Sequence, residues 1–232
     1  MTKATNIAAG MGNRLRPYVV SKNLIIYNKN NFKIGNKNQL TNLKKNLFQK
    51  NKIIIIRNVF KDTVNKILNI AKLRRKKPRF RKNRLNSKDL FIFNQNNKKS
   101  KVPGYYKKVL LYPWNKENLK YFNILKKYFI LKRKIEKNNL KRGNIFFDKN
   151  SSCVIQIMNY PKSKGFLVKH QDSKFKKKCI IQICTKKAKK SNKGGLIIYK
   201  KKDIINADNM MNKGDLMIFS SSLFHSVAKD ND

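Results

Sequence analysis

Apolar and polar residues follow two different patterns along the chain, and the change falls near residue 144. Before it, apolar residues recur every three or four positions over 115–138, which predicts an amphipathic helix. The β-branched run IIIIRNVF (53–60) predicts a strand, and the helical spacing in KDTVNKILNIAKL (61–73) predicts a helix directly after it. The segment 76–112 is basic and polar, and VPGYY within it favours a turn.

From residue 144 onward, short apolar runs alternate with clusters of Gly, Pro, Asn, Asp, Ser and Lys. Many short strands with such punctuation are typical of an antiparallel sandwich or jelly roll. We therefore predict an α+β chain, with a loose extension over 1–34, a helical part over 35–143 and a β-rich core over 144–232. The runs are SCVIQIMNY, GFLVKH, KCIIQICTK, GGLIIYKK, DIIN, GDLMIF and LFHSVA.

The high net charge of the chain does not by itself identify a binding partner. The chain has 57 basic and 11 acidic residues, a formal net charge of +46. Such a charge favours a nucleic-acid or anionic-surface partner. However, the basic residues are mostly Lys, spread along the chain and mixed with Asn and Ile, which also fits a bias toward A/T-rich codons. Arg, the planar phosphate ligand, clusters only in LRRKKPRFRKNR (73–84). Both interpretations stay open.

The cellular compartment is indicated by the absence of paired cysteines, of a signal peptide and of a membrane-spanning segment. The three cysteines, Cys153, Cys179 and Cys184, form no CxxC pair, which favours a reducing compartment without a disulfide framework. The first residues contain no apolar core of signal-peptide length, and the longest isoleucine run, IIII (53–56), is too short to cross a bilayer. We expect a cytoplasmic protein without a membrane span.

The chain has only two histidines, and one of them lies two residues from an aspartate. Residues i and i+2 of a strand point to the same face, so His170 and Asp172 can contact one ion. His225 follows another predicted strand and can return beside this pair. Two histidines and one carboxylate on one side of a metal leave the opposite positions open, which is the arrangement of non-haem Fe(II) oxygenases.

Three segments together resemble the Fe(II)/2-oxoglutarate-dependent oxygenase superfamily. They are QIMNYPKSKGFLVKHQDS (156–173), GGLIIY (194–199) and KGDLMIFSSSLFHSVA (213–228). The resemblance implies a double-stranded β-helix (jelly-roll) core, with His170, Asp172 and His225 as iron ligands. It also implies contacts of Gln156 and Tyr160 with 2-oxoglutarate or substrate; ordinary strand packing is the competing interpretation of this pair.

The same resemblance implies an enzyme. It would use Fe(II), 2-oxoglutarate and O₂ to hydroxylate a substrate that the sequence does not identify, with release of succinate and CO₂. Asp172 argues against the related halogenases, in which a small residue replaces this carboxylate.

The sequence departs from the family pattern after His225. The family commonly has an Arg about ten residues after the distal histidine, and it pairs with the far carboxylate of 2-oxoglutarate. The segment SVAKDND that follows His225 contains no Arg. Three interpretations are open: a last barrel strand is missing, Lys186 or Lys187 supplies the cation, or Lys229 does so at a different spacing.

The first residues carry a second, shorter resemblance. IAAGMGNRLRPY (7–18) resembles the glycine-rich nucleotide-binding loop of sugar-phosphate nucleotidyltransferases, through Gly10, Gly12 and Arg14. It ends within about a dozen residues and predicts a remnant rather than a working site.

Two other functions compete with the leading one, which is an oxygenase acting on a small molecule. An oxygenase directed at nucleic acid predicts binding with steep salt dependence. An inactive, truncated β-barrel that acts as a basic binding module predicts metal binding at most, without consumption of 2-oxoglutarate.

Overall fold

The computed structural model describes residues 23–33, 35–60, 63–66, 69, 90–95, 102–136, 145–146, 154–161, 164–173, 177–185, 195–200 and 203–229. Several sequence predictions lie outside these residues. They are the glycine-rich loop with Gly10, Gly12 and Arg14, the arginine cluster 73–84, Cys153, Lys186 and Lys187, and much of the helix predicted over 61–73.

The described strands form two sheets. The four-stranded sheet has the order β1 (Leu24–Asn28), β2 (Ile53–Arg57), β10 (Leu216–Ser220) and β7 (Cys179–Ile183). The seven-stranded sheet has the order β3 (Leu90–Gln95), β4 (Gly104–Leu111), β6 (Phe166–His170), β11 (Phe224–Ala228), β8 (Gly195–Lys200) and β9 (Asp203–Asn206), and β5 (Ile155–Asn159) pairs with β4. The β1–β2 pair is parallel and the others are antiparallel.

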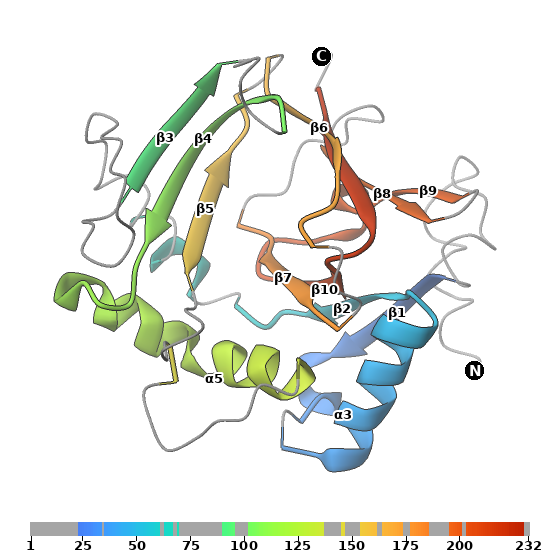
Figure 1. The fold of residues 1–232 in the computed structure, drawn as a ribbon. Coiled ribbons are helices and arrows are strands. Elements are labelled where there is room, and N and C mark those ends of the chain that lie inside the picture. Colours follow the sequence, from blue (N-terminus) through green and yellow to red (C-terminus); the bar gives the residue numbers. More distant parts are fainter. Residues whose placement is uncertain are drawn as a thin grey trace.

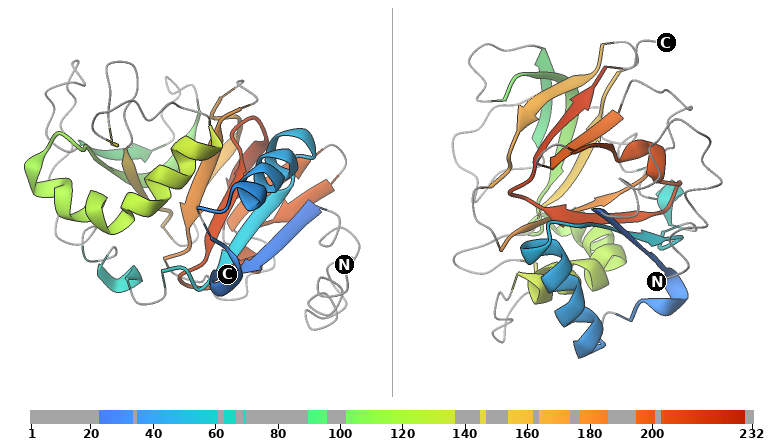
Figure 2. Two further views of the ribbon diagram at one scale, coloured as in Figure 1. Left: turned by 90° about the horizontal axis from the view of Figure 1, so that it is seen from below. Right: turned by 90° about the vertical axis from the view of Figure 1, so that its right-hand side faces the viewer.

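Helices cover one face of the four-stranded sheet. Figure 1 shows α3 (Lys37–Lys44) and α5 (Leu119–Ile135) below that sheet, and the side view in Figure 2 shows the same order of layers. The helical turn η2 (Lys45–Gln49) extends α3, and the short turns are η1 (Lys29–Asn31), η3 (Lys116–Asn118) and η4 (Asp208–Met210). In α5 the apolar residues Phe122, Leu125, Tyr128, Leu131 and Ile135 are buried, as their spacing predicts.

Two apolar cores follow from this layering. One lies between the helices and the outer side of the four-stranded sheet, and it includes Ile54, Ile56, Leu216 and Ile218. The other lies between the two sheets. The alternating residues Ile53, Ile55, Met217 and Phe219 join it, with Leu196, Ile198 and Ile205 from the seven-stranded sheet. β2 and β10 are therefore buried on both faces, which explains their unbroken apolar sequences.

The predicted mixed α+β class with largely antiparallel strands is confirmed, and each of the seven apolar runs after residue 144 contains a strand. The described strands form open sheets, not a closed barrel. The part predicted as helical, 35–143, also contributes β2, β3 and β4. The turn prediction for VPGYY is wrong for Gly104, Tyr105 and Tyr106, which belong to β4. Val109 and Leu111 of this strand point to the same face and are buried in the core that also contains the apolar residues of α5.

Candidate metal centre

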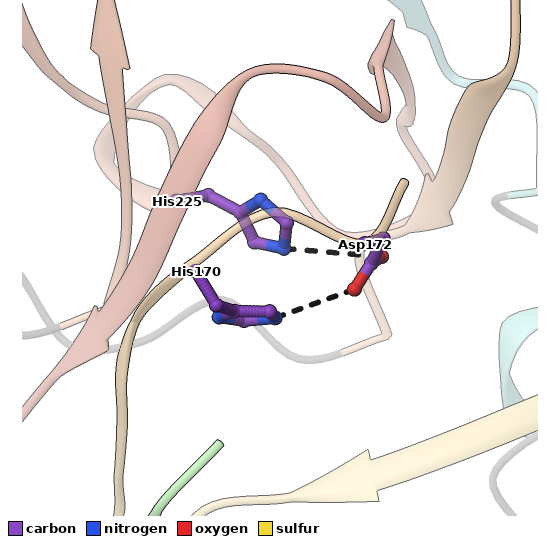
Figure 3. A group of neighbouring side chains, drawn as sticks. All are labelled: His170, Asp172 and His225. Carbon is purple, nitrogen blue, oxygen red and sulfur yellow. Dashed lines mark ion pairs between the residues drawn. The ribbon is translucent and has the colours of Figure 1, made fainter. Parts of the chain in front are cut away.

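Two neighbouring strands bring the two histidines together. In the β6–β11 pair, His170 and His225 lie directly opposite each other, and their ring centroids are 4.3 Å apart. The pairing shifts between His225 and Val227, which marks a β-bulge beside the site. Asp172 follows in the turn after β6, so its carboxylate lies against both rings (Figure 3).

The geometry brings one ligand atom from each residue to a common point. His170 Nε2 is 3.3 Å from Asp172 Oδ1, and His225 Nε2 is 3.9 Å from Asp172 Oδ2. The three ligand atoms lie within 4.8 Å of one another. Two ligands at right angles on a metal, each about 2.1 Å from it, are about 3 Å apart. The group therefore fits one metal ion after a small closing movement.

Backbone carbonyls orient both rings. His170 Nδ1 is 2.8 Å from the Val168 carbonyl oxygen, and His225 Nδ1 is 3.0 Å from that of Leu223. A carbonyl accepts only from a protonated nitrogen, which leaves each Nε2 unprotonated in the neutral ring and available to a metal. Fixing the tautomer in this way is common at metal-ligating histidines.

Burial and charge act differently on the three groups. Burial lowers the pKa of His225, which favours the neutral, metal-binding form. Burial also lowers the pKa of His170, but the hydrogen bonds to Asp172 and to Val168 outweigh it, and the net pKa is raised. The His170 hydrogen bond lowers the pKa of Asp172, which keeps this half-exposed side chain ionised.

The turn between β10 and β11 holds the Asp172 loop in place. Gln171 donates its side-chain amide to the Ser222 carbonyl at 2.6 Å, and the Ser173 backbone N–H donates to the Ser221 carbonyl at 3.3 Å. Phe219, at the end of β10, packs edge-on against His225 with centroids 5.4 Å apart. The sequence analysis did not single out Gln171 or Phe219, because their roles depend on partners about fifty residues away or on the opposite sheet.

The other predicted site residues lie further along the same sheet or outside the described residues. Gln156 is exposed on β5, and its amide nitrogen is 2.8 Å from the Met158 sulfur. The Tyr160 hydroxyl is 3.5 Å from the same sulfur. The pKa of Tyr160 is raised by burial, then by Tyr106, Asp208 and Asp172, so its hydroxyl stays protonated. The position of Lys186 is not among those described.

Lysines divide between the two faces of the seven-stranded sheet. Lys229 lies with its Nζ 5.2 Å from the centre of the Phe166 ring, on the side opposite Leu167 and the inner core. Lys108, on β4, pairs with Met158 of β5 and points away from the buried neighbour Val109. Its charge helps to lower the pKa of Asp172. Strand alternation in GYYKKVLL could have identified Lys108 as facing the site.

No family model, curated protein or solved structure matches the chain. Among the described residues, no helix is both long and apolar enough to cross a membrane. The interpretation of the site therefore rests on its own residues and their geometry.

Proposed function

We propose that the chain is an Fe(II)- and 2-oxoglutarate-dependent oxygenase that hydroxylates a small-molecule substrate. The observation that carries this proposal is the convergence of His170, Asp172 and His225 at the ends of two paired strands, within 4.8 Å of one another. Strands β6, β8, β9 and β11 lie in the seven-stranded sheet and β7 and β10 lie in the four-stranded sheet, an arrangement that supports the double-stranded β-helix that the sequence resemblance implies.

The three residues suit the metal. Two neutral imidazoles and one carboxylate form the facial ligand set of non-haem Fe(II) enzymes and leave coordination positions open. When bound, the metal would supply the oxygen chemistry, with 2-oxoglutarate converted to succinate and CO₂. The chain's own part is to fix the ring tautomers through Val168 and Leu223 and to hold Asp172 ionised.

Lys108 extends the proposal to the cosubstrate. It shares with His170 and Asp172 the inner side of the sheet, where its charge already acts on Asp172. Tyr106 and Tyr160 lie beside it, with ring centroids 6.1 Å apart. A cation and tyrosine hydroxyls are suitable partners for the second carboxylate of 2-oxoglutarate. We include Lys108 as its anchor, alongside the Lys186 and Lys187 candidates.

Anaerobic absorption spectroscopy tests the proposal. The purified chain is titrated with Fe(II) and then with 2-oxoglutarate, and a charge-transfer band of the chelate is expected. His170→Ala and Asp172→Ala should abolish the band, whereas Glu117→Gln, on the distant turn η3, should retain it. Lys108→Ala should retain Fe(II) binding but require at least about tenfold more 2-oxoglutarate, because a charge-assisted hydrogen bond of about 1.5–3 kcal/mol is lost.

Two outcomes contradict the proposal. In a chain shown to be folded by circular dichroism, absence of the band would exclude the cosubstrate complex. Fe(II) binding without any response to 2-oxoglutarate, and without succinate formation in air, would leave a metal-binding module instead of an oxygenase.

A further inference from the structure

We propose that the outer face of strands β9, β8, β11 and β6 binds single-stranded nucleic acid. The binding residues form a row across four strands: Ile204, Tyr199, Phe224 and Lys169, hereafter the outer row. This inference goes beyond the metal centre and does not depend on its metal or its activity.

Strand register aligns the outer row. Ile204 of β9 lies opposite Tyr199 of β8, and Tyr199 lies opposite Phe224 of β11. Their neighbours Ile198 and Ile205 are buried between the two sheets, so the row points outward. Ile204 is 67% exposed and Phe224 is 45% exposed. The described residues contain one other exposed large apolar side chain, Leu119, on α5.

Positive charge accompanies these apolar side chains. Lys169 Nζ lies 4.4 Å from the centre of the Tyr199 ring and 5.3 Å from that of Phe224. On the same face, Lys229 lies over Phe166. Strand alternation places no acidic residue at the described outward positions of these four strands. At its described positions, the face therefore combines flat apolar groups with cations and carries no carboxylate.

The charge and the flat aromatic groups together favour nucleic acid as the occupant. Aromatic side chains on a rigid sheet stack with bases, and neighbouring lysines pair with phosphates. A second copy of this chain would bring together two molecules of formal charge +46, which opposes self-association. A duplex hides the faces of its bases, so the aromatic residues favour a single strand.

The Tyr199 ring is held ready for such contacts. Its hydroxyl and the Ser226 hydroxyl are 3.0 Å apart, which fixes one edge of the ring on the sheet. Lys169 contacts two rings at once, so it can move from one ring to a phosphate without leaving the row. A preformed surface loses less side-chain entropy on binding.

Fluorescence anisotropy with labelled 15-nucleotide poly-U and poly-dT tests the inference on the metal-free full chain. Phe224→Ser should weaken binding at least about fivefold, as expected for the loss of one base stack. The matched control is Leu119→Ser, which removes an exposed leucine from α5 and should leave binding unchanged.

Salt dependence provides a second test. Lys169→Ala should reduce the slope of log affinity against log salt concentration by about 0.7, the value for one phosphate contact on a single strand. The control is Lys127→Ala. Lys127 Nζ also lies over a tyrosine ring, 5.2 Å from the centre of Tyr128, but both residues are on α5 and not on the outer face. This variant should leave the slope unchanged.

Several results would overturn the inference. These are no oligonucleotide binding, equal losses in each variant and its control, or equal affinity for a duplex or for polyphosphate, which has no bases. Binding to anionic phosphatidylserine vesicles that depends on Phe224, without competition by the oligonucleotide, would assign the row to a lipid surface instead. His170→Ala should bind oligonucleotide like the unmodified chain, which separates this test from that of the metal centre.

Discussion

The two faces of the β6–β11 strand pair carry side chains of different chemistry. Lys169 and His170 are sequence neighbours, as are Phe224 and His225. His170 and His225 point inward, where they meet Asp172 and Phe219. Lys169 and Phe224 point outward into the cationic, apolar outer row. One strand pair thus supports two different chemistries, because adjacent residues of a strand face opposite sides.

The comparison shows that burial, not residue type, decides whether an apolar side chain packs in the core or is available to a ligand. Phe219 and Phe224 are five residues apart, yet Phe219 is 1% exposed and Phe224 is 45% exposed. The inner phenylalanine fills the space between the sheets and supports His225. The outer one contributes little to the core and is available to a ligand. Variants of these neighbouring pairs should therefore have separable effects.

The largest expected effect is on stability, from Phe219→Ala. It removes a fully buried ring and should lower the free energy of unfolding by about 3–5 kcal/mol. Chemical denaturation followed by circular dichroism measures the change. Phe224→Ala is the matched control and should change the free energy of unfolding by less than about 1 kcal/mol. Equal losses from the two variants would contradict the assignment of the two faces.

The next effect is on metal affinity, from His225→Ala. Loss of one of three ligands should weaken Fe(II) or Co(II) binding at least about 100-fold, since removing even an outer partner of a ligand costs about 10- to 100-fold. Isothermal titration calorimetry under argon measures the dissociation constant. Phe224→Ser, the adjacent residue on the other face, should leave it unchanged. Retained affinity in His225→Ala would show that this histidine is not a ligand.

Much of the inner face could be predicted from sequence, and little of the outer row could. HxD spacing and a later histidine carry a specific chemical pattern, so His170, Asp172 and His225 were identifiable before the fold. The outer row has no such signal, because its four residues come from four strands. Register brings three of them together, and Lys169 joins them through its contacts with two rings. Lys108 was missed for a different reason: it lies in the segment 76–112, which was expected to be basic and polar with a turn at VPGYY, and which instead contains β4.

The hydrogen bonds at the starts of β10 and β7 were equally hidden from sequence. Asp215 follows Gly214 before β10, and both its oxygens accept hydrogen bonds, from Arg57 and from the backbone of Asn58 and Asn212. The sequence shows only a Gly-Asp pair before a strand. Two of the partners, Arg57 and Asn58, come from a segment about 160 residues earlier, and no local pattern indicates them. β7 is similar. The backbone N–H of its first residue, Cys179, donates to the carboxylate of Glu136, which follows α5, and its carbonyl accepts from the Lys132 ammonium of α5.

A smaller effect concerns protonation of the two histidines on the inner face, and therefore the pH dependence of metal affinity. In the metal-free chain the pKa of His170 is raised, with Asp172 as acceptor, and that of His225 is lowered by burial. A metal must displace the His170 proton, so affinity should fall as pH decreases through that pKa, by about tenfold per unit for one proton. Asp172→Asn removes the negative acceptor and should lower the pKa of His170, measured by NMR of its ring protons.

With only two histidines in the chain, the His225→Gln variant assigns the two sets of ring signals. An unchanged His170 titration in Asp172→Asn would show that the carboxylate does not control this proton. The Phe224→Ser variant, on the outer face, is the control and should leave both titrations in place.

The smallest expected effect is that of Ser226→Ala, which tests whether the outer row is preformed. The substitution removes the partner of the Tyr199 hydroxyl and should lower the free energy of unfolding by about 1 kcal/mol, as for one ordinary hydrogen bond. Metal affinity should not change, because Ser226 faces away from its neighbour His225.

Oligonucleotide affinity of Ser226→Ala should fall by about twofold to fivefold, since a mobile Tyr199 ring must be ordered on binding. Tyr199→Phe removes the same hydrogen bond but keeps the ring, so it should reproduce the loss. A weaker metal site in Ser226→Ala, with unchanged oligonucleotide binding, would mean that the two faces are coupled and that Ser226 supports the inner one.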